Sequence, residues 1–277
     1  MPELPEVETI KETLKLLAIN KTIHEVNIYW PKIIKHPDDA DHFKFLLKGQ
    51  TILDITRKGK FLLFHLDDYI LISHLRMEGK YSVHKSSEPI KKHTHVIFKC
   101  TDGKELRYND VRKFGTMHLY PKGEEFLNKP LSTIGPDPFD EAFTMDYFLN
   151  KVKRTDRVIK SVLLDQTVVA GLGNIYVDET LFKAGVHPLK RARKLTQKEV
   201  KAIRKHAIET LRDAVKQGGT TIRSYVNSQG DMGMFQQELF VYGQENNGCK
   251  VCGQSIVKMK VGGRGTHICN NCQKLKR

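Results

Sequence analysis

The first apolar repeat of the chain directly follows its six opening residues, Met-Pro-Glu-Leu-Pro-Glu. Apolar side chains then recur every three or four residues, a spacing that places them on one face of a helix. These side chains are Val7, Ile10, Leu14 and Leu17. The pattern predicts an N-terminal amphipathic helix that begins beside Pro2.

From about Thr22 to Tyr120 the pattern changes to short apolar or alternating runs, which predict β-strands. Turn-like pairs separate several of the runs, and Asp102-Gly103 is a good hairpin signal. Short strands at this spacing favour an antiparallel sandwich or barrel. The runs cover residues 51–56, 61–66, 69–74, 95–100 and 105–108.

The second half of the chain has a helical pattern. Residues 131–139 contain two prolines and a glycine, break the periodicity and predict a linker between domains. Thr196 with Glu199 three residues later is a capping box at the start of a long helix. The predicted helices lie around residues 148–152, 158–165, 174–184 and 196–216.

Two glycines, Gly171 and Gly173, allow a tight turn just before Asn174. The turn leaves Asn174 near a helix start, where backbone N–H groups point outward and can bind a phosphate. A plain N-cap is the alternative interpretation of Asn174. Residues 218–233 have few apolar anchors, and we expect them to form a mobile, functional loop.

Four cysteines near the C-terminus form two Cys-x-x-Cys pairs, Cys249 with Cys252 and Cys269 with Cys272. Two such pairs complete a tetrahedral site for one structural Zn²⁺ with no open position. Disulfides are the alternative, which a reducing location disfavours. The fifth cysteine, Cys100, lies in an apolar run and is expected to be a small buried side chain.

Residues 255–267, between the two cysteine pairs, predict a β-hairpin that turns at residues 262–265. Arg264 is flanked by glycines at this predicted tip. It could contact a phosphate, and an ordinary exposed arginine is equally consistent with the spacing.

The charge of the chain indicates a polyanionic partner. Its 277 residues include 46 Lys+Arg against 32 Asp+Glu, a net charge of +14, and nucleic acid is the leading candidate. Basic residues are dense between Lys190 and Arg223, although a solvated helix face would explain part of that run. No run reaches the ~18 apolar residues that span a bilayer, and the N-terminus is too acidic for a signal peptide. We therefore expect a cytoplasmic protein with no membrane partner.

Pro2 is a candidate nucleophile. Once Met1 is removed, the chain begins with a secondary amine, which can condense with an aldehyde-level carbon to form an iminium. The positive potential at a helix start would lower the pKa of this amine and favour its free form. The alternative is that proline and glutamate here only start a helix.

Taken together, the motifs resemble the formamidopyrimidine-DNA glycosylase family across essentially the whole chain. Six dispersed matches in the right order carry the resemblance. They are residues 2–9 (Pro-Glu-Leu-Pro-Glu-Val-Glu-Thr), 57–60 (Arg-Lys-Gly-Lys), 74–77 (His-Leu-Arg-Met), 110–115 (Asp-Val-Arg-Lys-Phe-Gly), 173–176 (Gly-Asn-Ile-Tyr) and 264–267 (Arg-Gly-Thr-His).

The resemblance implies an α+β fold. It places an N-terminal helix and antiparallel β-sandwich in residues 1–130, a linker in 131–140, a helical helix–two-turn–helix domain in 141–240 and a β-hairpin Cys₄ zinc finger in 241–277. It also implies a monomer that binds damaged double-stranded DNA in the cleft between the domains, associated with the nucleoid of a bacterium.

The implied activity is base-excision repair: removal of oxidised purines such as 8-oxoguanine and of formamidopyrimidines, then strand cleavage by β,δ-elimination. Pro2 matches the nucleophile that attacks the sugar C1′ and forms the Schiff base. Glu3 matches the acid/base group, Lys60 a phosphate-contacting proton donor, and Arg264 the zinc-finger arginine associated with δ-elimination.

Other matched residues are implied to contact DNA. A base inside a duplex must be extruded before attack, so a wedge has to fill the vacated stack. Met77, Arg112 and Phe114 match that inserted triad, whereas pattern alone favours Met77 and Phe114 as sheet core. His74, His93 and Asn174 match DNA-contacting positions, and residues 218–235 match the loop that closes over the extruded lesion.

Two alternatives stay open. An endonuclease VIII-like enzyme would share the proline and zinc finger but prefer oxidised pyrimidines. A non-catalytic zinc-ribbon DNA-binding protein would use Pro2 only as a helix starter.

Overall fold

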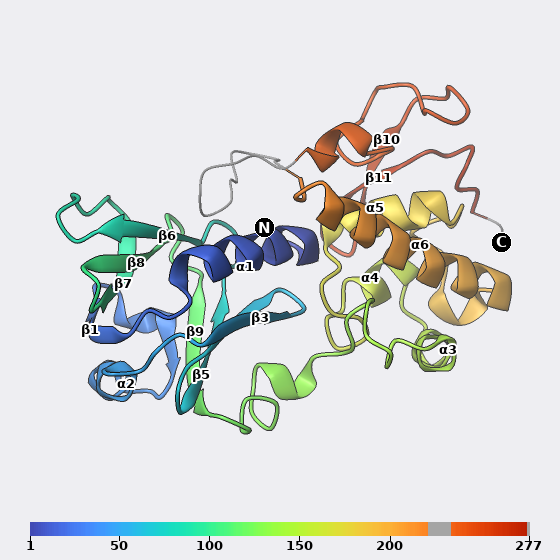
Figure 1. Cartoon of the computed structure of the whole chain (residues 1–277). Coiled ribbons are helices and arrows are strands. Elements are labelled where there is room, and N and C mark those ends of the chain that lie inside the picture. The colour runs from blue at the N-terminus through green and yellow to red at the C-terminus, as the bar shows by residue number, and fades with distance from the viewer. Residues whose placement is uncertain (221–233, 276–277) are drawn as a thin grey trace. The chain divides into compact units, whose positions relative to one another are not determined.

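The computed structural model of the chain describes residues 1–220 and 234–275, which form two compact units. Unit 1 covers Met1–Ser132, and unit 2 covers Thr133–Thr220 with the described residues from Met234 on. Unit 1 holds two β-sheets and unit 2 is mainly helical with a small hairpin, which confirms the predicted α+β class (Figure 1). None of the described helices is long and apolar enough to span a membrane.

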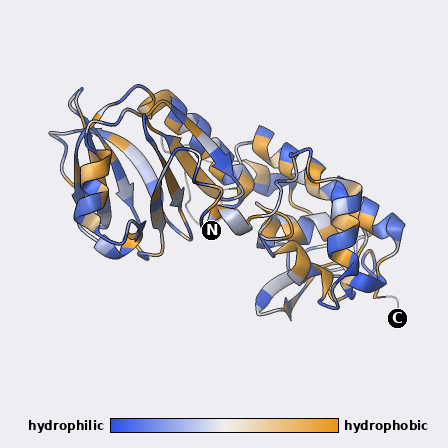
Figure 2. Cartoon of the chain, turned by 90° about the horizontal axis from the view of Figure 1, so that it is seen from below, coloured by the Kyte–Doolittle hydropathy of each residue, from blue (hydrophilic) through white to orange (hydrophobic). Residues whose placement is uncertain are grey.

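The predicted N-terminal helix is α1, Leu4–Ala18. Its apolar face, including Val7, Ile10 and Leu14, is buried in the core of unit 1. Figure 2 shows hydrophobic and hydrophilic residues interspersed along the elements of both units, as expected for helices and strands that bury one face.

The strands of unit 1 form two sheets, ordered β1-β7-β8-β6 and β2-β9-β5-β4-β3. All neighbours in these sheets are antiparallel except β2 and β9, which are parallel and so depart from the antiparallel prediction. The strands are β1 Ile23–Ile28, β2 Ile34–His36, β3 Asp54–Lys58, β4 Phe61–His65, β5 Tyr69–His74, β6 Lys80–Lys85, β7 Thr94–Cys100, β8 Lys104–Asn109 and β9 Thr116–Pro121.

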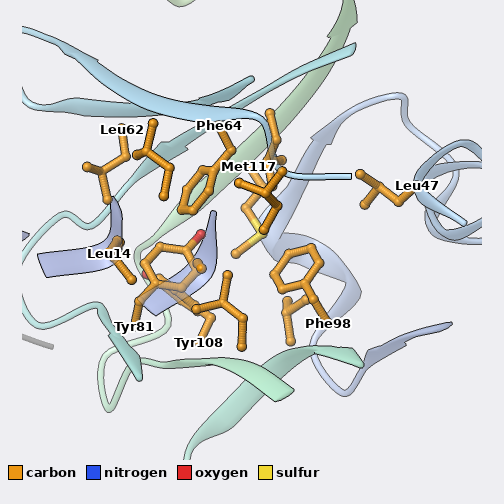
Figure 3. Packing of buried hydrophobic residues seen from close by; sticks show 14 of the residues in the cluster. Leu14, Leu47, Leu62, Phe64, Tyr81, Phe98, Tyr108 and Met117 are labelled. Carbon is orange, nitrogen blue, oxygen red and sulfur yellow. The ribbon is translucent and has the colours of Figure 1, made fainter. Parts of the chain in front are cut away.

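The core of unit 1 lies between the two sheets (Figure 3). Phe64 from one sheet packs against Tyr81 from the other, with ring centroids 5.3 Å apart, and Tyr81 packs against Tyr108 at 5.0 Å. The hydroxyl of Tyr81 donates to Ser73 Oγ at 2.8 Å, so its polar end is satisfied inside the core. Cys100 is buried as predicted, and this burial raises its pKa to about 11.

Two details of the strand prediction were wrong. Residues 40–47 form a helix, α2 Ala40–Leu47, because the Asp39 carboxylate caps it by accepting from Asp41 N and His42 N, both at 3.1 Å. Phe43 and Leu47, four residues apart, bury its inner face. The strand predicted for residues 51–56 is instead β3, Asp54–Lys58.

Unit 2 contains the predicted helices. The capping box at the start of α6 is confirmed: Thr196 N donates to Glu199 Oε2 at 2.7 Å, and Glu199 N donates to Thr196 Oγ1 at 3.2 Å. The elements are α3 Met145–Lys153, α4 Ile159–Leu163, α5 Asn174–Lys183, α6 Gln197–Lys216, β10 Val257–Val261 and β11 Arg264–Ile268. Short 3₁₀ helices are Pro31–Ile33 in unit 1, Leu131–Thr133 at the boundary, and Ala192–Lys194 and Phe235–Glu238 in unit 2.

Candidate functional site

Two ion pairs fix the direction of α1 against β3. Lys15 Nζ lies 2.8 Å from Asp54 Oδ1, and Arg57 Nε lies 2.7 Å from Glu8 Oε2. Glu8 and Lys15 are seven positions apart in the helix, and Arg57 and Asp54 are three positions apart in the strand, which in both cases spans about 10 Å. Because the earlier helix residue pairs with the later strand residue, helix and strand are antiparallel neighbours. The start of α1 therefore lies towards the Lys58 end of β3.

Pro2 and Glu3 stand at this start, and both are buried. Glu3 is the N-cap of α1, is only 3% exposed, and donates its backbone N–H to Glu6 Oε2 at 2.9 Å. Pro2 comes directly before the N-cap, so its amine, once Met1 is removed, would lie beside the positive end of the helix.

The turn between β3 and β4 carries Lys60 to the same end of the sheet. Gly59 has φ +56°, and its carbonyl accepts from Arg57 Nη1 at 2.9 Å, so the guanidinium that binds Glu8 also holds the turn. Burial raises the pKa of Glu8, but hydrogen bonds from Lys11 and Arg57 outweigh it and leave this pKa below its usual range. Lys60 is 5% exposed, which is uncommon for a lysine.

His74 lies next to this turn. It is the cross-strand partner of Phe61, and the two rings make an edge contact with centroids 4.5 Å apart. Burial, together with the positive charges of Arg76 and Lys60, lowers the pKa of His74 to about 3. The imidazole is therefore neutral at pH 7, and because its Nδ1 accepts from Arg76 N at 2.9 Å, its proton is on Nε2 and can be donated.

We expect His74 to make the protein less stable in acid. Between pH 6.5 and about 3 the unfolded chain binds a proton at this position and the folded chain does not, so the free energy of unfolding falls as pH falls, by at most about 1.4 kcal/mol per pH unit. In urea titrations between pH 6.5 and 4.5, His74→Gln should lose this part of the pH dependence. Equal slopes for parent and variant would contradict the assignment.

Two neighbouring loops beside His74 connect one sheet to the other. One joins β5 to β6 and the other joins β8 to β9, and because β5 pairs with β9 and β6 with β8, the loops lie side by side. Gly79 of the first and Gly115 of the second pack on the same Tyr108 hydroxyl, which would lie 2.2 and 1.8 Å from a Cβ at these positions. Met77 and Phe114, in the two loops, are 37% and 51% exposed, so their interpretation as sheet core is wrong.

The loop from β8 to β9 is built around the buried carboxylate of Asp110. Asp110 Oδ1 accepts from Arg112 N at 3.0 Å, and Oδ2 accepts from Phe114 N at 2.9 Å and Gly115 N at 2.8 Å. The guanidinium of Arg112 lies 4.7 Å from the ring centroid of Phe114. Sequence reasoning missed this role of Asp110, although aspartate before a turn is a recognised signal.

His93 lies beside the same loop. It has φ +67°, and its carbonyl accepts from Asp110 N at 3.0 Å. The structure thus brings the predicted site residues of unit 1 to one end of its sheets: Pro2, Glu3, Lys60, His74, Met77, His93, Arg112 and Phe114.

In unit 2, Asn174 is the first residue of α5 and Gly173 is its N-cap, so the N-cap interpretation of Asn174 is wrong. Asn174 Nδ2 donates to Gly265 O at 2.8 Å. Arg264 also departs from the prediction, because it is the first residue of β11 and only Gly262 and Gly263, with φ +54° and +78°, form the turn. It is exposed, one residue from the carbonyl that Asn174 binds.

A fully buried ion pair that sequence reasoning missed holds this hairpin on the helices. Lys160 Nζ of α4 lies 2.6 Å from Asp178 Oδ1 of α5 and donates to Thr266 Oγ1 at 2.7 Å. The other carboxylate oxygen of Asp178 accepts from His267 N at 2.9 Å. Because both charges have several partners, the pair fixes β11 against α5.

The four cysteines at the end of unit 2 converge. Their Sγ atoms all lie within 4.8 Å of one another, which fits tetrahedral coordination of one Zn²⁺ by Cys249, Cys252, Cys269 and Cys272. Glu179 of α5 supports this region by accepting the backbone N–H groups of residues 240–242, each at 2.9 Å. The metal has no open position, so it is structural.

The basic run around α6 has partly structural roles. Arg204 Nε donates to Phe143 O at 2.7 Å, and Lys190 Nζ lies 2.6 Å from Glu199. These two side chains therefore stabilise the fold through contacts within the protein. Most of the predicted loop, residues 221–233, lies outside the described residues.

Comparisons with known proteins agree with this organisation. Residues 1–117 match the formamidopyrimidine-DNA glycosylase N-terminal domain, 134–226 the H2TH domain of the same glycosylase, and 249–275 a zinc finger found in FPG and IleRS. The last match and the cysteine geometry confirm the prediction of one structural zinc.

Curated relatives and solved structures match over nearly the whole chain. The formamidopyrimidine-DNA glycosylase of Oceanobacillus iheyensis is 69% identical over 99% of this chain and 98% of its own, and that of Bacillus subtilis is 55% identical over the full length of both. Lactococcus lactis Fpg in complex with DNA containing an abasic site has a TM-score of 0.92 and 41% identity over 99% of this chain and 100% of its own. A complex of the same enzyme with DNA containing N7-benzyl-Fapy-dG gives the same values.

Proposed function

Because the chain belongs to the formamidopyrimidine-DNA glycosylase family, we propose that it excises oxidised purines from duplex DNA and then cleaves the strand at the resulting abasic site. Its activity as a glycosylase on damaged DNA follows from the family and from relatives solved with damaged DNA. The observation that best supports the finer proposal is the clustering of Pro2, Glu3, Lys60 and His74 at one end of unit 1, next to the exposed Met77 and Phe114 loops.

In the proposed reaction, the nitrogen lone pair of Pro2 forms a bond to C1′ while the glycosidic bond breaks. The base leaves with the bonding electrons and takes up a proton. The C1′–O4′ bond then breaks, O4′ takes its electron pair and a proton, and an iminium forms between Pro2 and C1′. Glu3, the buried N-cap one residue away, is the nearest carboxylate in sequence for these proton transfers.

Strand cleavage follows from the iminium. Its positive charge acidifies the C2′ proton, and removal of that proton breaks the C3′–O bond and expels the 3′ phosphate. Removal of the C4′ proton then breaks the C5′–O bond and expels the 5′ phosphate. We assign phosphate binding next to the reacting sugar to Lys60 and the neutral His74, since an ammonium group and an Nε2–H donor can both bind phosphate oxygens. Arg264 is the proposed contributor to the second elimination.

Base extrusion is assigned to the two exposed loops. Apolar side chains inserted between base steps unstack a duplex, and the exposed Met77 and Phe114 are of the right kind. Arg112, stacked on Phe114, can fill the space beside the orphaned base with hydrogen-bond donors. His93 and Asn174 complete the proposed DNA contacts.

The partner is damaged double-stranded DNA, and we propose that the protein acts as a monomer at the bacterial nucleoid. The predicted domain boundaries, at residues 130, 140 and 240, stay predictions. Along the chain, the division between the two compact units falls between Ser132 and Thr133, inside the linker segment 131–140.

Borohydride trapping on two lesions tests the proposal. We expect a covalent protein–DNA adduct and faster single-turnover excision on duplex carrying 8-oxoguanine opposite cytosine than on duplex carrying thymine glycol. Faster excision of thymine glycol would instead indicate an endonuclease VIII-like enzyme. An absence of both excision and adduct on the two duplexes would indicate a non-catalytic DNA-binding protein.

A further inference from the structure

Trp30, the single tryptophan of the chain, contacts Lys113 in the loop from β8 to β9. Lys113 Nζ of that loop is 4.1 Å from the Trp30 ring centroid, and Lys32 Nζ is 5.6 Å from it. Trp30 is half-buried and packs against the core of unit 1, so its ring is a fixed surface. A lysine ammonium within about 6 Å of an indole face is attracted by the ring electrons.

Lys113 occupies a special position, because it stands between Arg112 and Phe114. Its φ of +58° is in the left-handed region, which a side chain with a Cβ adopts at some cost. The Asp110 carboxylate binds the backbone of residues 112, 114 and 115 but not that of Lys113, whose N–H donates to Asp110 O at 3.3 Å. Lys113, Arg112 and Phe114 are all exposed, and the contact with Trp30 favours the conformation in which Lys113 lies on the ring and Arg112 and Phe114 project from the loop.

We propose that Trp30 is a positioning residue for base extrusion: by holding Lys113, it keeps the Arg112–Phe114 pair in its projecting conformation before DNA binds. This inference rests on the proposed function, because it assumes that Arg112 and Phe114 enter the duplex. A loop that is already ordered avoids an entropic cost when it inserts. Trp30 acts through Lys113 and does not itself need to reach the lesion.

The chain offers a matched set of variants. Trp30→Leu removes the aromatic face, and Trp30→Phe keeps one. Lys32→Ala removes a cation from the same ring but lies outside the loop, so it is the control for Lys113→Ala. In the DNA-free protein, Lys113→Ala should change the fluorescence of Trp30 more than Lys32→Ala does.

The decisive measurement is single-turnover excision of 8-oxoguanine from two duplexes, one with cytosine opposite the lesion and one with a propanediol spacer opposite it, which carries no base and has no C1′ that Pro2 could attack. With cytosine opposite, Trp30→Leu and Lys113→Ala should each lower the rate roughly three- to tenfold, and the double variant should be no slower than the slower single one. With no partner base to separate, the loss should be below about twofold. Trp30→Phe should recover most of the parent rate on both duplexes.

Several results would overturn the inference. An equal loss of rate on the two duplexes would indicate a structural or general DNA-binding role. A loss on neither duplex, or multiplicative effects in the double variant, would also contradict it. So would equal fluorescence changes for Lys32→Ala and Lys113→Ala. Failure of the proposed function has a different signature, because the parent protein would then form no borohydride adduct or would excise thymine glycol faster than 8-oxoguanine. Lys113 is exposed, so its variant tests the inference even if Trp30→Leu impairs folding.

Discussion

Chains that retain Met1 are expected to bind lesion DNA and to excise nothing. Retention turns the Pro2 nitrogen into an amide, whose lone pair is delocalised and cannot attack C1′, so the single-turnover excision rate should fall by at least about a thousandfold and the borohydride adduct should vanish. Affinity for lesion DNA should change much less, because the candidate DNA contacts at His74, His93 and Asn174 do not involve this nitrogen.

The matched pair is the same chain with Met1 present and with Met1 removed, compared by mass spectrometry, DNA binding and trapping. Pro2→Gly with Met1 removed is a useful intermediate, since its primary amine can still form a Schiff base. An undiminished adduct from the Met1-retaining chain would show that the nucleophile lies elsewhere, with Lys60 the first candidate to examine.

Removal of zinc is the second change with a large expected effect. In zinc-finger peptides, metal binding contributes roughly 10–16 kcal/mol that is inseparable from folding. Cys252→Ser, or chelation of the parent, should therefore unfold the β10–β11 hairpin and displace Arg264. We expect a loss of DNA affinity of at least about a hundredfold, which corresponds to roughly 2.7 kcal/mol.

Unit 1 should stay folded under these conditions, because its core contains no residue of the zinc region. The fluorescence of Trp30, which packs on that core, reports this directly. Cys100→Ala is the control: the buried fifth cysteine is no ligand, so this variant should keep one zinc per chain. Unchanged DNA affinity after metal loss, or loss of zinc from Cys100→Ala, would contradict the assignment.

Features that depend on the spacing of residues close together in the chain could be predicted from the sequence. The apolar repeat of α1, the capping box of Thr196 and the paired cysteines all depend on residues a few positions apart, and the structure confirms them. The candidate site residues came from short motifs, and the structure supplies a reason for their clustering that the motifs did not contain: β5 and β9 are neighbours.

Interactions between distant residues could not be predicted. Lys160 lies in an apolar helical run, where a lysine is expected to face the solvent. Its burial is favourable only because Asp178 and Thr266, which are distant in sequence, bind its ammonium group. The role of Asp110 likewise depends on a chain reversal that brings three backbone N–H groups within hydrogen-bond distance of its carboxylate. Helix α2 was missed because Phe43 and Leu47 lie in a segment interpreted as strand.

The Asp110 carboxylate has a consequence for how this surface can change in evolution or in the laboratory. It holds the loop from β8 to β9 entirely through backbone groups, while the side chains of residues 111, 112 and 114 point outward. Asp110 and Gly115 are fixed by their contacts and Lys113 by its contact with Trp30, but positions 111, 112 and 114 can exchange residues with little effect on folding. Under the role proposed for this loop in base extrusion, a new preference for the base opposite the lesion can therefore arise without loss of the fold.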